Sequence, residues 1–230
     1  MRHTADEARR QLRAAVTTGF ATGITRQGAA ANTGQLRHSA VLILFGALDR
    51  VPAAASKSAP VSAELDVLLT RRADHLRHHP GQIAFPGGRV EAGDTSRAHT
   101  ALREAAEETG LDPAGVEVLG ELPAIHLAVS DSLVTPVIGW WRLPSAVAAD
   151  HSESVEVFRV PVAELLRPSA RGTSVLRTDR GTFRGAAFRL GPQFGRHIVW
   201  GFTGMLLASL FDAVGWAEPW DRTQEFAIRR

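Results

Sequence analysis

Residues 87 to 111 read GGRVEAGDTSRAHTALREAAEETGL and hold four charged residues in close order: Arg103, Glu104, Glu107 and Glu108. A helix brings positions i, i+3 and i+4 onto one face, so the three glutamates share a stripe. Like charges arranged in this way repel one another, and a divalent cation would relieve the repulsion. Hard oxygen ligands suit Mg²⁺ or Mn²⁺ better than zinc, so the stretch predicts a cation site for phosphate chemistry.

The residues around this cluster predict a loop, a helix and a second loop. Asp94, Thr95 and Ser96 are each able to cap a helix N-terminus. Small and apolar residues between positions 98 and 106 favour the helix and give it a narrow inner face. Gly110, followed by Leu111, is a typical helix stop. A solvated helix face with Arg–Glu pairs is the alternative reading of the glutamates, but the flanking Pro-Gly-Gly and Gly-Leu favour the catalytic one.

The stretch resembles the Nudix box, G-x5-E-x7-R-E-U-x-E-E-x-G-U with U apolar, whose family hydrolyses nucleoside diphosphates linked to another moiety. Gly88 fits the box glycine, but Asp94 stands where the box usually has Glu, and eight residues instead of seven separate Asp94 from Arg103. Both departures also occur in the coenzyme A pyrophosphatase branch of the family. The resemblance implies catalytic roles for Arg103, Glu104, Glu107 and Glu108.

The same resemblance implies one to three Mg²⁺ or Mn²⁺ ions as cofactors. The implied metal ligands are Glu104, Glu107 and Glu108, with the carbonyl group of Gly87 as a further one. Arg103 is expected to orient a glutamate through an ion pair, and Glu107 lies one helical turn further on. A general base is also required. Glu107 or Glu108 is one option, and a glutamate from a later segment, Glu153 or Glu156, is another; a solvated strand end is the alternative reading of the last two.

A second motif lies just upstream, where residues 68 to 88 read LLTRRADHLRHHPGQIAFPGG. It resembles the signature of the coenzyme A branch, L-L-T-x-R-S-x3-R-x3-G-x3-F-P-G-G, and only Ala73 departs from it. The matching residues are Leu68, Leu69, Thr70, Arg72, Arg77, Gly81, Phe85, Pro86, Gly87 and Gly88. Further matches cover residues 133–136, 153–161 and 198–203, so the likeness spans roughly residues 37 to 214.

This motif identifies the expected substrate contacts. Coenzyme A carries a 3′-phosphate besides its diphosphate, and the arginine fork matches phosphate geometry. Arg72 and Arg77 are therefore the candidates for phosphate binding. Gly88 and Phe85 complete the expected substrate-binding set, although Phe85 is also a natural core anchor for the Gly-Gly turn. The resemblance implies cleavage of coenzyme A or acyl-coenzyme A into 3′,5′-ADP and (acyl-)4′-phosphopantetheine.

Composition excludes several other kinds of site. The 230 residues contain no cysteine, so a thiolate metal site, a disulfide framework and a cysteine nucleophile are excluded. The formal net charge is +2, and the pI of about 10.2 reflects a chain with one lysine and no tyrosine, so it gives no case for nucleic-acid binding. No run reaches the ~18 apolar residues of a membrane span. The N-terminus lacks an apolar signal region, so a cytoplasmic enzyme is expected.

The order of predicted elements gives an α/β fold with a mixed sheet. Helices are expected at 5–16, 162–166 and 197–214, with a hairpin arm at 182–190. Strands are expected at 40–45, 65–70, 116–122, 134–141 and 155–160. Pro136 predicts an edge or a bulge in the fourth of these. The resemblance implies a Nudix-like α/β/α sandwich at 37–215, with an N-terminal helix and connector at 1–36 and a C-terminal tail at 216–230.

Some alternatives stay open at the level of sequence. Another nucleoside diphosphate derivative, such as ADP-ribose or NADH, is an alternative substrate, although it does not require the 68–88 motif. A catalytically silent, ligand-binding Nudix module is a different class of function, and the intact glutamates weigh against it. The sequence does not choose between Mg²⁺ and Mn²⁺ or between free, acylated and oxidised coenzyme A. A homodimer built through the N-terminal segment is one option for the oligomeric state.

Overall fold

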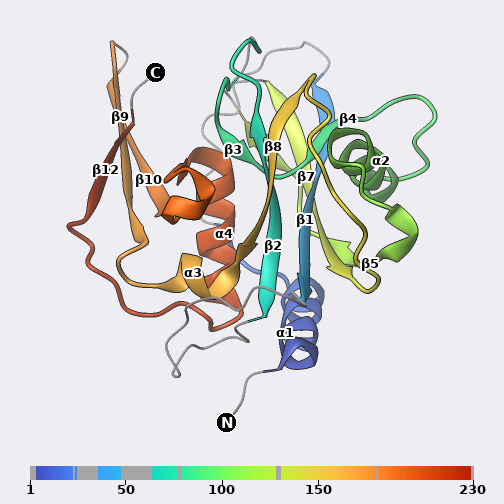
Figure 1. Ribbon diagram of the computed structural model, residues 1–230, viewed down its shortest axis with the longest axis horizontal. Helices are drawn as coiled ribbons and strands as arrows, with labels where there is room; N and C mark the ends of the chain where they lie inside the picture. Colours follow the sequence, from blue (N-terminus) through green and yellow to red (C-terminus); the bar gives the residue numbers. More distant parts are fainter. Residues whose placement is uncertain are drawn as a thin grey trace.

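The computed structural model describes residues 4–22, 24, 36–47, 64–76, 79–127, 131–179 and 181–228. Eight strands form a central sheet: β1 Arg37–Ala47, β2 Leu65–Arg72, β3 Ile83–Ala84, β4 Gly87–Arg89, β5 Val116–Glu121, β6 Ile125–Leu127, β7 Ser132–Trp141 and β8 Ser154–Pro161. The main path runs β3-β2-β1-β7-β5, with β4 beside β1, β6 beside β7 and β8 beside β2 (Figure 1). β1 and β7 are parallel and the other pairs are antiparallel, so the sheet is mixed.

Alternation of side chains along β1 divides the core into two halves. Leu42 and Leu44 point to one face of the sheet, and Ile43 and Phe45 point to the other. The first face packs against α2 (Arg97–Thr109). The second face packs against α1 (Ala5–Thr18), α3 (Val162–Leu166) and α4 (Gly201–Ala213). The predicted α/β class, with helices on both faces of a mixed sheet, is confirmed.

The ends of α2 follow from its flanking residues. The Ser96 hydroxyl accepts a hydrogen bond from the His99 N–H at 3.0 Å, so Ser96 is the capping residue among the three candidates. Gly110 ends the helix in the left-handed conformation, with φ 68°, and its N–H donates to the Ala106 carbonyl at 2.9 Å. The helix therefore begins and ends where the sequence places it, and its glutamates lie in its second half.

β7 differs from the prediction based on Pro136. An edge position is wrong, because β7 lies inside the sheet between β1 on one side and β5 and β6 on the other. Pro136 stands where the antiparallel partner changes from β6 to β5, and its carbonyl accepts the Leu122 N–H at 2.8 Å. A residue without an N–H is tolerated at this interruption. The β5–β7 pair does contain an irregularity, but it lies in β5, where Leu119 is an extra residue between Val118 and Gly120, and not in the strand of Pro136.

A second sheet of four strands lies beside the first: β9 Arg171–Thr178, β10 Gly181–Arg189, β11 Ile198–Val199 and β12 Glu225–Ile228, in the order β11-β10-β9-β12. The sequence pattern predicts only one of these strands, because the hairpin arm expected at 182–190 corresponds to β10. The expected tail at 216–230 is wrong for residues 216 to 228. Trp216 is 1% exposed and packs edge-on against Phe45 of β1, with ring centroids 6.0 Å apart, and β12 pairs in parallel with β9.

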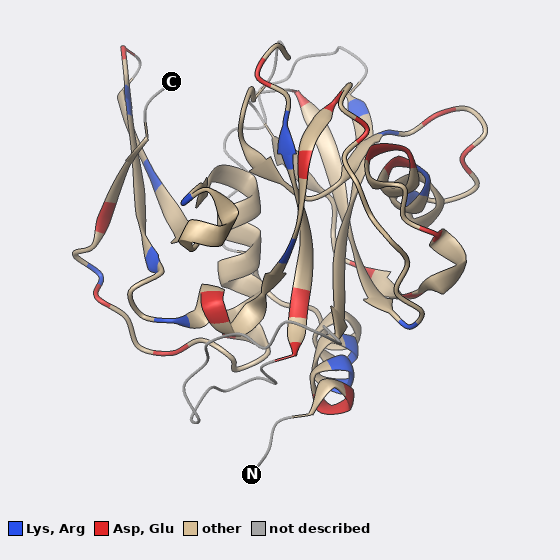
Figure 2. Cartoon of the chain, viewed as in Figure 1, with Lys and Arg blue, Asp and Glu red and all other residues tan. Residues whose placement is uncertain are grey.

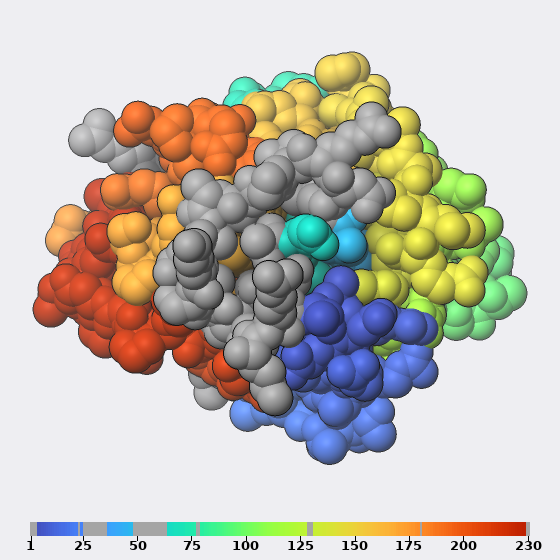
Figure 3. All heavy atoms as spheres, turned by 60° about the horizontal axis from the view of Figure 1, so that its bottom comes forward, coloured from blue at the N-terminus to red at the C-terminus, as the bar shows by residue number. Residues whose placement is uncertain are grey.

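The N-terminal helix belongs to the same packed body. Leu12 is fully buried, and the Gln11 side chain accepts a hydrogen bond from the Trp216 indole at 2.7 Å. Arg9 and Arg13 both form ion pairs with Glu117 of β5. Figure 3 shows α1, in blue, packed on the molecular surface. The connector expected at 17–36 lies largely outside the described residues, and the division between an N-terminal segment at 1–36 and a domain that begins at residue 37 stays a prediction.

Candidate functional site

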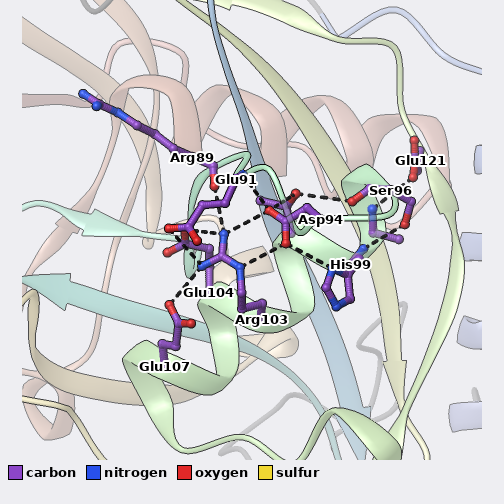
Figure 4. Close-up of polar contacts among 11 residues, drawn as sticks. Arg89, Glu91, Asp94, Ser96, His99, Arg103, Glu104, Glu107 and Glu121 are labelled. Atoms are coloured by element: carbon purple, nitrogen blue, oxygen red, sulfur yellow. Dashed lines mark hydrogen bonds and ion pairs between the residues drawn. The ribbon is translucent and has the colours of Figure 1, made fainter.

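Arg103 of α2 is the centre of a cluster of carboxylates (Figure 4). Its guanidinium bonds Asp94 through Nε and Nη2, both at 3.1 Å, and pairs with Glu104 at 3.1 Å and with Glu107 at 3.0 Å. It also donates to the Arg89 carbonyl at 2.9 Å. The predicted Arg103–Glu107 pair is present, but it is one of several contacts. Figure 2 shows acidic and basic segments together on α2, and a basic segment at one end of β2.

Asp94 anchors this arrangement from the loop before the helix. Its side chain is 2% exposed, and it accepts further hydrogen bonds from the Thr100 hydroxyl and the Glu91 N–H, both at 2.9 Å. The hydrogen bonds from Arg103 hold the pKa of Asp94 well below its usual range. The shorter carboxylate therefore fills the position at which the box usually has Glu, and it contacts the box arginine directly.

Glu104 lies against the Gly-Gly turn of β4. A Cβ added at Gly88 would lie 2.3 Å from the Glu104 carboxylate, so only glycine leaves room for this side chain. A Cβ at Gly87, whose φ is 157°, would lie 2.4 Å from the Ala40 carbonyl oxygen of β1. Burial raises the pKa of Glu104, and the neighbouring charges of Glu107 and Glu153 act in the same direction. Gly87 therefore allows β4 to lie close to β1, and Gly88 allows the Glu104 carboxylate to lie close to β4.

Glu108 is the buried member of the acidic set, at 4% exposed. One carboxylate oxygen, Oε2, accepts the Ser154 hydroxyl at 3.3 Å, and the Gly87 N–H also bonds the carboxylate. The other oxygen, Oε1, is buried and has no partner among the described residues. Burial raises the pKa of Glu108 to about 7, against the opposing charge of Arg72. An acid placed in this way is stabilised by a cation on its unpartnered oxygen.

The donor set fits a hard divalent cation, although the side chains do not enclose one as they stand. Within the described ranges, no three His, Asp or Glu side chains converge into a ready-made metal site. Arg103 accounts for part of this, because it holds Glu104 and Glu107 in ion pairs. Carboxylate oxygens, one of them buried and unpartnered on Glu108, are nevertheless the ligands that Mg²⁺ and Mn²⁺ prefer.

The four expected substrate-binding residues differ in their placement. Arg72 lies at the end of β2 with its charge acting on Glu108, which places it beside the acidic set. Phe85 is 4% exposed and belongs to the core on the face of the sheet opposite α2, which is the position of a core anchor, and its role as a substrate contact stays a prediction. Gly88 lies against the Glu104 carboxylate and has no side chain that would clash with it. Arg77 lies outside the described residues.

The two candidates for the general base differ in their distance from the glutamates of α2. The charge of Glu153 acts on both Glu104 and Glu108, so Glu153 lies near the acidic set. Glu156 pairs with Arg71 at 3.3 Å and lies 3.8 Å from the His197 ring. Arg71 is two positions after Leu69, a core residue of the face opposite α2, so Glu156 points away from the glutamates of α2. The structure therefore does not bring Glu156 together with the glutamates of α2, and its role as a base stays an untested prediction.

Two polar residues of the site have no recognisable signal in the sequence. Ser154 is 1% exposed, and its hydroxyl donates a hydrogen bond to Glu108. The Asp150 carboxylate accepts a hydrogen bond from the Ser154 N–H, and the Asp150 N–H donates one to the Glu108 carbonyl at the end of α2. Both lie in the segment DHSES, residues 150 to 154, which reads as an ordinary polar loop.

In the part of the chain that the structure describes, no helix is long and apolar enough to cross a membrane.

Comparison with known proteins gives consistent likenesses. A family model described as NUDIX domain matches residues 57–175. A protein named uncharacterized Nudix hydrolase NudL, from Enterobacter sp. (strain 638), is 38% identical over 150 residues, which are 65% of this chain and 75% of that protein. The protein of the same name from Salmonella newport (strain SL254) is 39% identical over 151 residues, with the same shares covered.

Solved structures with similar architecture include a Nudix hydrolase from M. smegmatis, RenU, and a MutT/nudix family protein from Enterococcus faecalis. RenU is 22% identical with a TM-score of 0.42, and the match covers 56% of this chain and 76% of RenU. The E. faecalis protein is 15% identical with a TM-score of 0.47, and the match covers 94% of this chain and 76% of that protein.

Proposed function

Because the chain belongs to the Nudix hydrolase family, we propose that it is a metal-dependent diphosphatase acting on coenzyme A or acyl-coenzyme A. The products would be 3′,5′-ADP and (acyl-)4′-phosphopantetheine. The observation that carries this proposal is the position of Arg72, near the start of the 68–88 motif and at the end of β2, beside the buried Glu108. A cationic residue of the substrate motif thus lies next to the acidic set that serves the chemistry.

The roles of the acidic residues follow from their positions. Glu104, Glu107 and Glu108 would hold the cations, and Gly87 would contribute its carbonyl group. Bound Mg²⁺ or Mn²⁺ would offset charge on the diphosphate oxygens and activate a water molecule. Arg103 keeps Glu104 and Glu107 on one side of the helix through its ion pairs. Asp94 holds Arg103 in turn, so it supports the site without contacting the substrate.

Hydrolysis of the diphosphate adds water across a P–O bond: a hydroxyl group joins one phosphorus, and the other phosphate leaves with the shared oxygen. A base must accept the proton of the attacking water. We propose Glu153 for this role, because it is exposed and its charge acts on Glu104 and Glu108. Arg72 would bind a phosphate of the substrate and stabilise its charge.

Product analysis by chromatography tests the proposal. The purified protein would be given coenzyme A, dephospho-coenzyme A, ADP-ribose and NADH in parallel, once with Mg²⁺ and once with Mn²⁺. Preferential cleavage of coenzyme A supports the proposed substrate. Preferential cleavage of ADP-ribose or NADH would assign a different nucleoside diphosphate substrate, and no cleavage at all would favour a ligand-binding module. A homodimer and a cytoplasmic location stay predictions from the sequence.

Arg77→Ala is expected to weaken coenzyme A binding by about 10- to 100-fold, the equivalent of one charge-assisted hydrogen bond to phosphate. The sequence motif assigns Arg77 to the substrate, and its guanidinium would bind the 3′-phosphate. The measurement is KM for coenzyme A and for dephospho-coenzyme A, which lacks that phosphate. The second substrate is the matched control and should lose little. Equal losses on both substrates would show that Arg77 does not recognise the 3′-phosphate.

Gly88→Ala is expected to lower kcat by on the order of 100-fold in a folded protein, because the added methyl group would displace the Glu104 carboxylate. The measurement is turnover of coenzyme A together with thermal unfolding. Gly93→Ala is the control, since a Cβ at Gly93, in the loop that leads to α2, would meet no atom within 4 Å. Normal turnover of the Gly88 variant would mean that the site tolerates a displaced Glu104.

A further inference from the structure

The first residue of β8 is turned toward α2 by an irregularity in its pairing with β2. Arg71 pairs with Glu156, whereas the next residue, Arg72, pairs with Ser154, so Val155 is an extra residue on β8. In a regular strand, residues 154 and 156 would share one face. The bulge breaks that alternation, and Ser154 lies on the face of Arg72 and α2.

The redirected side chain contacts the buried glutamate of the site. Ser154 is 1% exposed, and its hydroxyl donates to Oε2 of Glu108 at 3.3 Å. The hydroxyl leaves the other oxygen, Oε1, buried and without a partner among the residues that the structure describes. The carboxylate therefore has one oxygen held by the protein and one oxygen available to a ligand.

The loop before β8 fixes Ser154 to the end of α2. The Asp150 N–H donates to the Glu108 carbonyl at 3.2 Å, which attaches the loop to the last turn of the helix. The Asp150 carboxylate accepts the Ser154 N–H at 2.9 Å and the Glu153 N–H at 3.2 Å. Asp150 thus holds the backbone of Ser154 and that of Glu108 together, so the distance between their side chains does not depend on a flexible loop.

We infer that Ser154 is a positioning residue that orients the Glu108 carboxylate for a divalent cation. The inference rests on the proposed function, in which Glu108 is a cation ligand. Hydrogen bonds from the protein to a ligating side chain fix its orientation, and their loss usually costs about 10- to 100-fold in metal affinity. The bulge in β8 places the Ser154 hydroxyl on the face of the sheet that packs against α2.

The test compares Mn²⁺ binding, measured by isothermal titration calorimetry, in the 230-residue protein and its variants. Ser154→Ala is expected to bind Mn²⁺ roughly 10- to 100-fold more weakly, and Ser154→Thr, which keeps a hydroxyl group, is expected to restore part of the affinity. Ser152→Ala is the matched control, because Ser152 is exposed in the same loop and its hydroxyl bonds Asp150 and not Glu108. At saturating Mn²⁺, KM for coenzyme A should be unchanged in all three variants.

Wild-type Mn²⁺ affinity in folded Ser154→Ala would overturn the inference, as would an equal loss in Ser152→Ala. If the alanine variant does not fold, Ser154→Cys replaces it, because a thiol fills similar space and is a weaker donor. Unchanged affinity in that variant would also overturn the inference. The binding comparison uses no substrate, so a failure to cleave coenzyme A would reject the proposed substrate while the Ser154 result still decides the positioning role.

Discussion

Glu108→Gln is expected to lower kcat for coenzyme A by on the order of 100- to 1,000-fold, in a protein that remains folded. Glutamine has the same shape but no charge, so it cannot serve as an anionic ligand on its unpartnered oxygen. The Ser154 hydroxyl can still donate to the amide oxygen, which keeps the buried contact. The measurement is steady-state turnover with saturating Mn²⁺, together with circular dichroism.

The same variant should change how stability depends on pH. Burial raises the pKa of Glu108 from its ordinary value of 4.5 to about 7, so the folded state binds this proton more tightly than the unfolded state. Wild-type stability should therefore fall as pH rises from about 4.5 to about 7, by roughly 3 kcal/mol for a shift of this size. Glu108→Gln carries no proton to lose at this position and should show a smaller decline, because only the contributions of Asp66 and Glu104, whose pKa values burial also raises, remain. Urea unfolding in the presence of a chelator at pH 5 and pH 8 measures the difference.

The control for both measurements is Glu91→Gln, which changes a glutamate that is 68% exposed at the edge of the same cluster. We expect near-normal turnover and the wild-type pH dependence in this control. Full activity in Glu108→Gln would remove Glu108 from the cation site. An identical pH dependence in Glu108→Gln and the wild type would show that another group causes the decline.

Arg103→Gln is expected to reduce both activity and stability. The buried Asp94 loses two hydrogen bonds to the guanidinium, and Glu104 and Glu107 lose the cation between them. The pKa of Asp94 should rise toward its ordinary value, since those hydrogen bonds hold it down. We expect a melting temperature several degrees lower and kcat lower by on the order of 100-fold, because misplaced ligands lose alignment with the substrate. Thermal unfolding and steady-state kinetics measure the two effects.

Arg97→Gln is the matched control for this change. Arg97 lies six residues earlier on the same helix, and its side chain donates to His38 at 3.1 Å and not to the acidic cluster. We expect this variant to have a melting temperature and a kcat close to those of the wild type. Comparable losses in the two variants would mean that helix charge, and not the contacts of Arg103, accounts for the result. A stable but inactive Arg103→Gln would limit its role to the alignment of the glutamates.

Local patterns predicted the central part of the fold correctly. The apolar run at 40–45 became the middle strand, since a continuous run predicts burial on both faces. The capping serine and the glycine stop bounded α2, because both signals act within one helical turn. The acidic residues of α2 share a site because their spacing matches the helix period. Periodicity and capping are local properties, and the sequence displays them directly.

The errors concern features that depend on distant contacts. Sequence reasoning missed Ser154, because its position beside Glu108 depends on one extra residue in β8, and no residue type marks that bulge. The edge assigned to β7 ignored the change of partner strand that accommodates Pro136. The expected tail was wrong because Trp216 and β12 are stabilised by contacts with residues far away in sequence. Tertiary packing determined each of these outcomes.

The packing of Trp216 against Phe45 has a consequence for synthesis on the ribosome. The two residues are 171 positions apart (216 − 45), so at roughly 5–20 residues per second about 10 to 35 seconds separate their appearance. During that interval the apolar face of β1 lacks one of its covering side chains. The nascent chain therefore exposes this surface until translation has passed Trp216, and it is in this interval that a chaperone would have most to shield.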